Sequence, residues 1–222
     1  MSGPAAPQRR ARSYPAAAAI LAQRDPVLRR LVDDAGTPRV SAPTEEPFEA
    51  VVRSIVYQQL AGAAASAIHR RLVAALGDEV TAERLLTLDA VTLRAVGLSG
   101  NKAASLQDLA TKTLDGSVVL DPAGLRKLDD AEIVTRLSAV RGIGKWTAEM
   151  FLMFQLRRLD VWPTGDLGVR KGYGLAWGIP TPTPKQLEAL GEPYHPYRSV
   201  VAWYCWRAAE LYGGAAESAL TR

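Results

Sequence analysis

The sequence predicts an all-α fold, and three observations support this prediction. Apolar residues recur at helical spacing, three and four positions apart, along most of the 222 residues. Glycines and prolines interrupt this pattern at the places where turns between helices are needed. Only residues 117–120 resemble a strand, and 48% hydrophobic residues are enough to form a core. We therefore expect a chain that folds as helices alone.

The expected helices follow from this spacing in chain order. They cover residues 16–35, 48–60, 64–76, 85–96, 102–114, 130–139, 149–156, 166–176, 185–190 and 197–212. A loop with three prolines at residues 36–47 ends the first helical stretch, and Gly77 ends the antiparallel pair that follows. Gly97 and Gly116 separate the helices in the middle of the chain. The prolines of residues 180–184 form a linker before the last two helices.

Residues 1–15 are expected to form a disordered basic tail that carries Arg9, Arg10 and Arg12. The whole chain has 27 Lys and Arg residues against 23 Asp and Glu, which gives a net charge of +4 and a pI near 9.3. This balance allows a polyanionic partner, but it is also common among ordinary soluble proteins. Charge alone therefore selects no function.

Cysteine content and hydropathy exclude several classes of protein. The single cysteine, Cys205, cannot form an intramolecular disulfide or supply the four thiolates of an iron–sulfur cluster, and we expect it in the core. No apolar run approaches the ~20 residues that a membrane-spanning helix requires. We expect a cytoplasmic protein with no membrane partner.

The segment LSAVRGIGKWTA, residues 137–148, breaks a helical pattern and then restarts it. Gly142 and Gly144 have no Cβ and can adopt positive φ, so their backbone can approach another molecule closely. We expect the amides of residues 143–146 to be unpaired at the start of the second helix, where they would attract phosphate. A Gly-x-Gly sequence by itself indicates only a turn, but Lys145 adds a cation at the same helix start.

Four further segments accompany this turn in a fixed order. They are FEAVVRSIVYQQL at 48–60, GLSGNKA at 97–103, TGDLGVR at 164–170 and PYRSVVAWYCW at 196–206. Together with the turn, they resemble the helix-hairpin-helix superfamily of DNA glycosylases, and within it the DNA-3-methyladenine glycosylase II group, over residues 48–212. One position departs from the family pattern, because Arg141 stands where proline usually precedes the first glycine.

The resemblance implies two helical lobes with a cleft between them and a helix-hairpin-helix DNA-binding motif at about residues 130–157. A single glycosylase domain is then expected over residues 16–222. Larger members of the group carry an additional β domain at the amino terminus. The ~45 residues before Phe48 are too few to form such a domain with its own core, so we expect the compact form.

Asp166 is the residue expected to carry the chemistry. By resemblance it occupies the position of the catalytic aspartate, whose carboxylate stabilises positive charge on the deoxyribose as the base leaves. An alkylated base leaves as a neutral molecule, so one carboxylate suffices without a dedicated general acid. Aspartate is also a favoured N-cap, and Asp166 stands where a helix is expected to begin. The two roles are compatible.

The position of one lysine indicates a monofunctional enzyme. In the strand-cutting relatives that hold an iron–sulfur cluster, a lysine two residues after the second glycine of the hairpin forms a Schiff base. Trp146 stands at that position here, and Lys145 instead matches a cation that binds phosphate. The resemblance therefore implies hydrolysis without lyase activity, with no iron–sulfur cluster and no required cofactor.

The resemblance also assigns contacts to the base and to the strand. Trp146, Trp206 and Tyr57 match aromatic positions of the base pocket, where a flipped alkylated base would stack, although Trp206 and Tyr57 could equally fill the core. Gln59 or Leu60 is expected to enter the space that the flipped nucleotide leaves, while glutamines here could instead cap backbone groups. The residues expected to contact the DNA backbone are Gly142, Ile143, Gly144, Lys145 and Thr147.

Metal binding is expected only at the hairpin. Members of this superfamily often hold a structural monovalent cation there through main-chain carbonyls, which in this chain would come from Ser138, Val140 and Ile143. No spacing of His, Cys, Asp and Glu indicates a transition-metal site. His69 and His195 are isolated, and we expect His69 on a solvated face.

The predicted function is base excision repair by a monomeric enzyme that removes alkylated bases of the 3-methyladenine type from double-stranded DNA. In a prokaryote such an enzyme would associate with the nucleoid. The alternative is a non-catalytic helix-hairpin-helix module that binds bent or damaged DNA, and Asp166 separates the two hypotheses. Excision of mismatched or oxidised bases is a third hypothesis, for which no specific set of hydrogen-bonding residues is evident.

Overall fold

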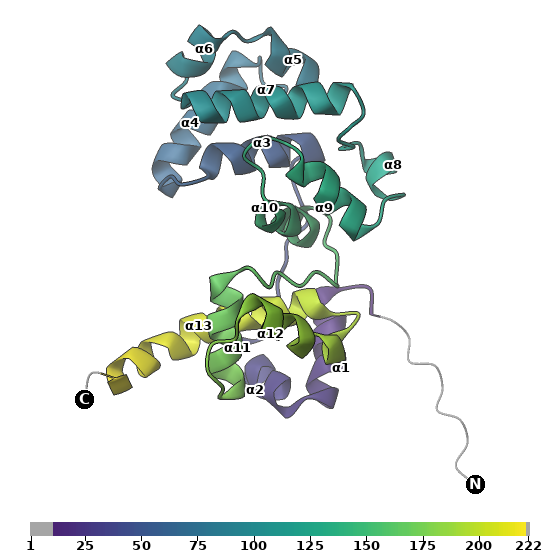
Figure 1. Cartoon of the computed structure of the whole chain (residues 1–222), viewed down its shortest axis with the longest axis vertical. Helices are drawn as coiled ribbons and strands as arrows, with labels where there is room; N and C mark the ends of the chain where they lie inside the picture. The colour runs from purple at the N-terminus through teal and green to yellow at the C-terminus, as the bar shows by residue number, and fades with distance from the viewer. Residues whose placement is uncertain (1–10, 221–222) are drawn as a thin grey trace. The chain divides into compact units, whose positions relative to one another are not determined.

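The computed structural model describes residues 11–220, with side chains described through Gly214. Every regular element among these residues is a helix, so the predicted all-α fold is confirmed (Figure 1). The chain divides into two compact units. The first is formed by the two ends of the described chain, residues 11–41 and 157–220, and the second by Ala42–Leu156. None of the described helices is apolar over a length that could cross a membrane.

The folded chain begins earlier than the predicted boundary at residue 16. Ser13 is the N-cap of α1 (Tyr14–Arg24), and its hydroxyl accepts a hydrogen bond from the amide of Ala16. Tyr14 is buried, and its hydroxyl donates to the carbonyl of Arg158 at 3.2 Å. A disordered tail through residue 15 is therefore wrong for residues 13–15, because the Tyr14 ring is part of the core. Residues 1–10 of the predicted tail lie outside the described residues.

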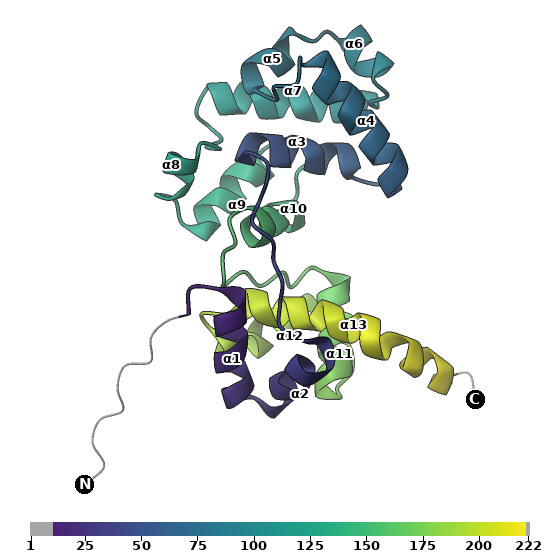
Figure 2. The same cartoon turned by 180° about the vertical axis from the view of Figure 1, so that it is seen from behind.

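The helices of the first unit come from both ends of the chain. In order they are α1 (Tyr14–Arg24), α2 (Pro26–Ala35), α11 (Leu167–Trp177), α12 (Pro184–Leu190), the short 3-10 helix η2 (Glu192–Tyr194) and α13 (Arg198–Leu220). The predicted stretch 16–35 is two helices, because Asp25 ends α1 and caps α2 by accepting from the amides of Val27 and Leu28. Both views show α11 beside α13 (Figures 1 and 2).

The contact between α11 and α13 depends on one glycine. A Cβ built on Gly172 would overlap the carbonyl oxygen of Cys205, so no larger residue fits without separating the two helices. Tyr204 and Cys205, on the same stretch of α13, are fully buried. Because backbones this close leave little freedom, the first turn of α11 is held in a defined place relative to α13.

The helices of the second unit come from one continuous stretch of the chain. They are α3 (Pro47–Tyr57), α4 (Gly62–Ala75), α5 (Ala82–Thr87), α6 (Ala90–Ala95), α7 (Gly100–Leu114), α8 (Pro122–Leu125), α9 (Asp130–Ser138), α10 (Lys145–Met150) and the π-helical turn η1 (Phe151–Gln155). The core of this unit contains Ile55, Leu72, Leu85, Leu106 and Leu109, all fully buried. The long helix α7 packs on both α3 and α5, which places it at the centre of the unit.

The prediction of one helix over residues 85–96 is wrong. The structure has α5 and α6 there, separated at Leu88 and Asp89. Leu88 has extended backbone, and the Asp89 carboxylate accepts from the amide of Thr92 at 2.7 Å as the N-cap of α6. Apolar spacing continues across this break because both short helices bury leucines, Leu85 and Leu93, in the same core.

Candidate functional site

Asp166 lies at the start of α11 and is its N-cap. Its Oδ1 atom accepts a hydrogen bond from the amide of Val169 at 2.8 Å and another from the indole Nε1 of Trp206 at 3.0 Å. The capping role foreseen from the sequence is therefore present. The side chain remains partly exposed, so a half-buried carboxylate is held in a fixed orientation by one backbone donor and one aromatic donor.

Gly168 makes the contact between Asp166 and Trp206 sterically feasible. A Cβ at Gly168 would lie 3.0 Å from Cδ1 of Trp206 and 3.1 Å from Oδ1 of Asp166. Both distances are shorter than ordinary contacts, so a side chain here would displace the indole or the carboxylate. The sequence Asp-Leu-Gly thus allows an aromatic ring from α13 to lie against the first turn of α11.

Cys205 is fully buried and close enough to Asp166 to interact with its charge. Burial raises the pKa of its thiol well above the usual range, and the nearby charge of Asp166 raises the pKa further. The thiol therefore stays neutral and is a poor nucleophile. The expected core role of Cys205 is confirmed.

The predicted hairpin is formed by α9 and α10 and contains a tight turn. The amide of Ile143 donates to the carbonyl of Val140 at 3.1 Å, and Gly142 has φ of 76°. These are features of a type II turn, in which the third residue needs positive φ. Gly144 has φ of −96°, so of the two glycines only Gly142 uses the left-handed region. The expectation that the Ile143 amide is unpaired is wrong, because this turn hydrogen bond uses it.

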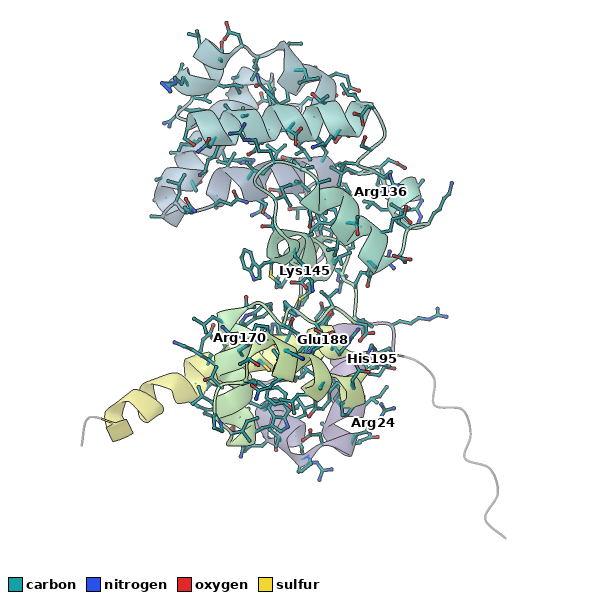
Figure 3. All side chains as sticks on the ribbon, viewed as in Figure 1. Arg24, Arg136, Lys145, Arg170, Glu188 and His195 are labelled. Carbon is teal, nitrogen blue, oxygen red and sulfur yellow. The ribbon has the colours of Figure 1, made fainter. Side chains whose placement is uncertain are left out.

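Two amides at the start of α10 match the prediction. Within the described residues, the amides of Gly144 and Lys145 donate to no other group. The Lys145 side chain is 67% exposed at the same helix start, with its Nζ 3.6 Å from Oε1 of the buried Glu149 (Figure 3). Backbone donors and an exposed ammonium group at one helix start are suited to binding a phosphate.

A cavity of about 930 Å³ opens in the second unit beside this turn. Among the predicted site residues, it is lined by Tyr57, Gln59, Gly142, Ile143, Trp146 and Thr147. Trp146 is 51% exposed, which is unusual for so large an apolar side chain. The structure thus brings Trp146 and Tyr57 to one cavity, while Trp206 lies beside Asp166 in the first unit.

The loop after α3 contains the residues expected to enter the DNA stack. Gln58 does not extend freely, because its side-chain amide donates to the carbonyl of Gly142 at 3.0 Å. Gln59 and Leu60 are exposed, and Gln59 has φ of 57° in the left-handed region. Lys102 donates from Nζ to the carbonyl of Val56 at 2.7 Å, which supports the end of α3 before the loop. The alternative that a glutamine caps a backbone group holds for Gln58.

Two charged residues at the cavity were not singled out from the sequence. The Arg53 guanidinium lies 5.8 Å from the centre of the Tyr57 ring and pairs with Glu45 at 2.7 Å. Tyr57 also makes an edge contact with His69, with 6.2 Å between the ring centres. His69 is half-buried rather than fully on a solvated face: its Nε2 atom is buried without a partner in the described structure, and burial lowers its pKa.

The three hairpin carbonyls are partly compatible with the expected monovalent cation. Within the described residues, the carbonyls of Ser138 and Ile143 accept no hydrogen bond, as a cation ligand requires. The carbonyl of Val140 already accepts from Ile143 and keeps one lone pair. The same part of the chain contains no cluster of three His, Cys, Asp or Glu side chains that could hold a metal. Carbonyl oxygens are hard ligands of the kind that bind hard cations.

Comparison with known proteins identifies the family. The model described as "HhH-GPD superfamily base excision DNA repair protein" matches residues 52–196. The chain belongs to this family. The predicted family and the predicted class of function, base excision DNA repair, are thereby confirmed.

Individual relatives resemble the chain over most of its length. DNA-3-methyladenine glycosylase 1 of Schizosaccharomyces pombe is 36% identical over 188 residues, which cover 82% of each protein. The structure of the S. pombe 3-methyladenine DNA glycosylase in complex with abasic DNA has a TM-score of 0.74 at 34% identity and covers 88% of this chain and 97% of that one. For the DNA-3-methyladenine glycosidase of Bacillus halodurans, the TM-score is 0.79 at 33% identity, with coverages of 87% and 89%.

Proposed function

We propose that this protein is a monofunctional DNA glycosylase that excises alkylated bases of the 3-methyladenine type from double-stranded DNA and leaves an abasic site. The observation that carries the proposal is the fixed carboxylate of Asp166, held on one oxygen by the Val169 amide and the Trp206 indole. The relatives named above as DNA-3-methyladenine glycosylases support the substrate class.

In the proposed reaction the carboxylate of Asp166 acts on the sugar. Rupture of the N-glycosidic bond builds positive charge on the deoxyribose, and a nearby carboxylate stabilises this oxocarbenium-like state. The same group orients the water that adds to the sugar carbon. A base alkylated on a ring nitrogen departs as a neutral molecule, so protonation of the leaving group is not required.

The aromatic residues would receive the displaced base. An electron-deficient alkylated ring is attracted to an aromatic face by about 0.5–2 kcal/mol. Trp146 and Tyr57 line the cavity of the second unit, and Trp206 adds a ring beside the carboxylate. Gln59 and Leu60 are exposed at the end of α3 and are the proposed wedge that offsets the cost of unstacking.

The strand itself would be held at the hairpin. The amides of Gly144 and Lys145 and the ammonium group of Lys145 are the proposed phosphate contacts, with Thr147 one turn further along. A monovalent cation on the carbonyls of Ser138, Val140 and Ile143 would add positive charge beside the same phosphate. No required cofactor is proposed.

Absence of lyase activity is also part of the proposal. Trp146 occupies the place at which strand-cutting relatives carry a nucleophilic lysine, and the exposed Lys145 side chain one residue earlier lies 3.6 Å from Oε1 of Glu149. The borohydride-reducible Schiff base that a lysine would form with the sugar is therefore not expected.

The proposal is tested with duplexes that carry a single 3-methyladenine, 7-methylguanine, hypoxanthine or N1-alkylated base. We expect alkali-labile sites to form at the alkylated purines, with no strand cleavage before alkali treatment. Treatment with borohydride during the reaction should trap no covalent adduct. Binding of these duplexes without release of any base would instead establish the non-catalytic module, and a trapped adduct would refute the monofunctional assignment.

A further inference from the structure

The turn of the hairpin is held by a carboxylate on another helix. Asp108 lies in the middle of α7, and its Oδ2 atom accepts a hydrogen bond from the backbone amide of Arg141 at 2.7 Å. These two residues are 33 positions apart in the sequence. Arg141 is the second residue of the Val140–Ile143 turn, so the bond fixes the turn at the residue before Gly142.

The same carboxylate is tied to the end of α9 through a lysine. Lys112, one turn after Asp108 on α7, donates from Nζ to Oδ2 of Asp108 at 2.8 Å and to the carbonyl of Ala139 at 2.6 Å. Ala139 is the C-cap of α9. Lys112 and Arg141 also hold the pKa of Asp108 below its usual value, which keeps the carboxylate charged and able to accept both bonds.

The turn also packs against a side chain of α7 at Gly142. A Cβ at Gly142 would lie 2.7 Å from Oγ of Ser105, which is buried and bonded to the carbonyl of Asn101. The Arg141 side chain donates to Oδ1 of Asn101 at 3.2 Å. Successive turns of α7 therefore contact the hairpin, and Asp108 makes the contact to its backbone amide.

The amide that Asp108 binds is not needed by the turn itself. In a type II turn the hydrogen bond runs from the first carbonyl to the fourth amide, and the second residue is the place where proline is favoured because its ring fixes φ. Arg141 stands at this second position and has both a free φ and an extra donor. The hydrogen bond to Asp108 uses this donor and restricts φ of Arg141.

We propose that Asp108 is a positioning residue of the hairpin, which replaces by a hydrogen bond the rigidity that a proline at residue 141 would supply. It acts on DNA through the turn, by keeping the amides of Gly144 and Lys145 directed at one phosphate. This inference deepens the proposed function, since it concerns the strand contact of that same protein.

The test measures binding of an abasic-site duplex and, separately, base release under single turnover at saturating protein. Asp108→Ala is expected to weaken binding by about tenfold, the loss of a charged hydrogen bond, while release from the bound complex stays within about twofold. Asp115→Ala is the matched control, because Asp115 is the C-cap of α7 and also accepts a backbone amide, that of Ser117, which is not part of the hairpin turn. It should bind within about twofold of the wild type.

The decisive variant combines two changes. Arg141→Pro in the Asp108→Ala background removes the amide and fixes φ by the ring, so binding should return to within about threefold of the wild type. If Asp108→Ala binds as tightly as the wild type, or if the added proline leaves the loss unchanged, the positioning role is refuted. A loss confined to base release at saturation refutes it as well.

Thermal melting of each variant distinguishes unfolding of the protein from displacement of the hairpin turn. If Asp108→Ala is not folded at the assay temperature, Asp108→Asn takes its place, since it retains the shape and one acceptor oxygen for the Arg141 amide but loses the charge beside Lys112. Its binding should weaken by about threefold, and equal binding refutes the proposal. Duplex binding reports on Asp108 even if the wild type releases no base, a result that would refute only the proposed function.

Discussion

The two regions that carry the candidate site are built in different ways. In the first unit, Asp166 and Trp206 are placed by α11 and α13, whose backbones approach so closely that Gly172 admits no side chain against Cys205. In the second unit, Trp146, Lys145 and Leu60 are exposed, and a set of single hydrogen bonds from α7 and α3 holds the turn beneath them.

This difference follows from what each region does in the proposed reaction. A carboxylate that stabilises charge in a transition state has to be held within a fraction of an ångström, which close helix packing provides. Groups that bind a strand have to reach outward to it, so they are exposed and depend on a rigid turn. We therefore expect substitutions in the first unit to affect chemistry or stability, and those in the second to affect binding.

The largest effect is expected from Asp166→Asn. Asparagine caps a helix about as well as aspartate, so the fold and the hydrogen bond from the Val169 amide should persist. Loss of the negative charge should slow base release by about 10²–10³-fold under single turnover, while duplex binding stays close to that of the wild type. Asp89→Asn, which changes another N-cap aspartate, is the control and should release base normally. Equal release by Asp166→Asn and the wild type would contradict the enzyme assignment.

The next largest effect is expected on stability from Gly172→Ala. The added methyl group overlaps the Cys205 carbonyl, and separation of α11 from α13 should lower the free energy of unfolding by about 2–3 kcal/mol, measured by urea denaturation. Gly213→Ala is the matched control on α13, since nothing lies within 4 Å of its Cβ position. It should leave stability unchanged or raise it by up to ~1 kcal/mol. Similar stabilities for the two variants would show that the close contact is not required.

A smaller effect on binding is expected from Lys145→Met in the second unit. Removal of one exposed cation should weaken duplex binding by about three- to tenfold and reduce the slope of log affinity against log salt by about one. Lys127→Met, an exposed lysine of the same unit outside the hairpin, should change neither quantity. If the two variants behave alike, the lysine at the start of α10 has no special role in holding the strand.

The smallest effect concerns pH and Asp108. The Lys112 hydrogen bond, with the Arg141 amide, lowers the pKa of Asp108 in the folded protein. The stability gained in this way is present above the unfolded-state pKa of about 4 and is lost as the pH falls through the lower folded-state pKa. The difference in unfolding free energy between the wild type and Asp108→Asn should be below about 1 kcal/mol at pH 7 and should shrink at pH 3. A constant difference at both values would contradict this linkage.

Much of the fold could be predicted because the information is local. Apolar spacing predicted helices that correspond to α3, α4, α7 and α9 to within a few residues. Errors arose where one helix ended and another began in the same apolar pattern, at Asp25 and Asp89, since each side chain caps a helix whose start the spacing does not reveal. Tyr14 was assigned to the tail because its burial comes from contacts with residues near Arg158.

The candidate site also combines features that the sequence predicts with features that only the tertiary structure shows. A glycine turn followed by a lysine, and an aspartate before a helix, are patterns within a few residues, so the sequence by itself determined the hairpin, the capping role of Asp166 and the family. Only the tertiary structure paired Asp166 with Trp206 across 40 positions and placed Asp108 on the amide of Arg141. These contacts join groups that are far apart in the sequence and whose spacing has no helical period, because the packing of separate helices brings them together.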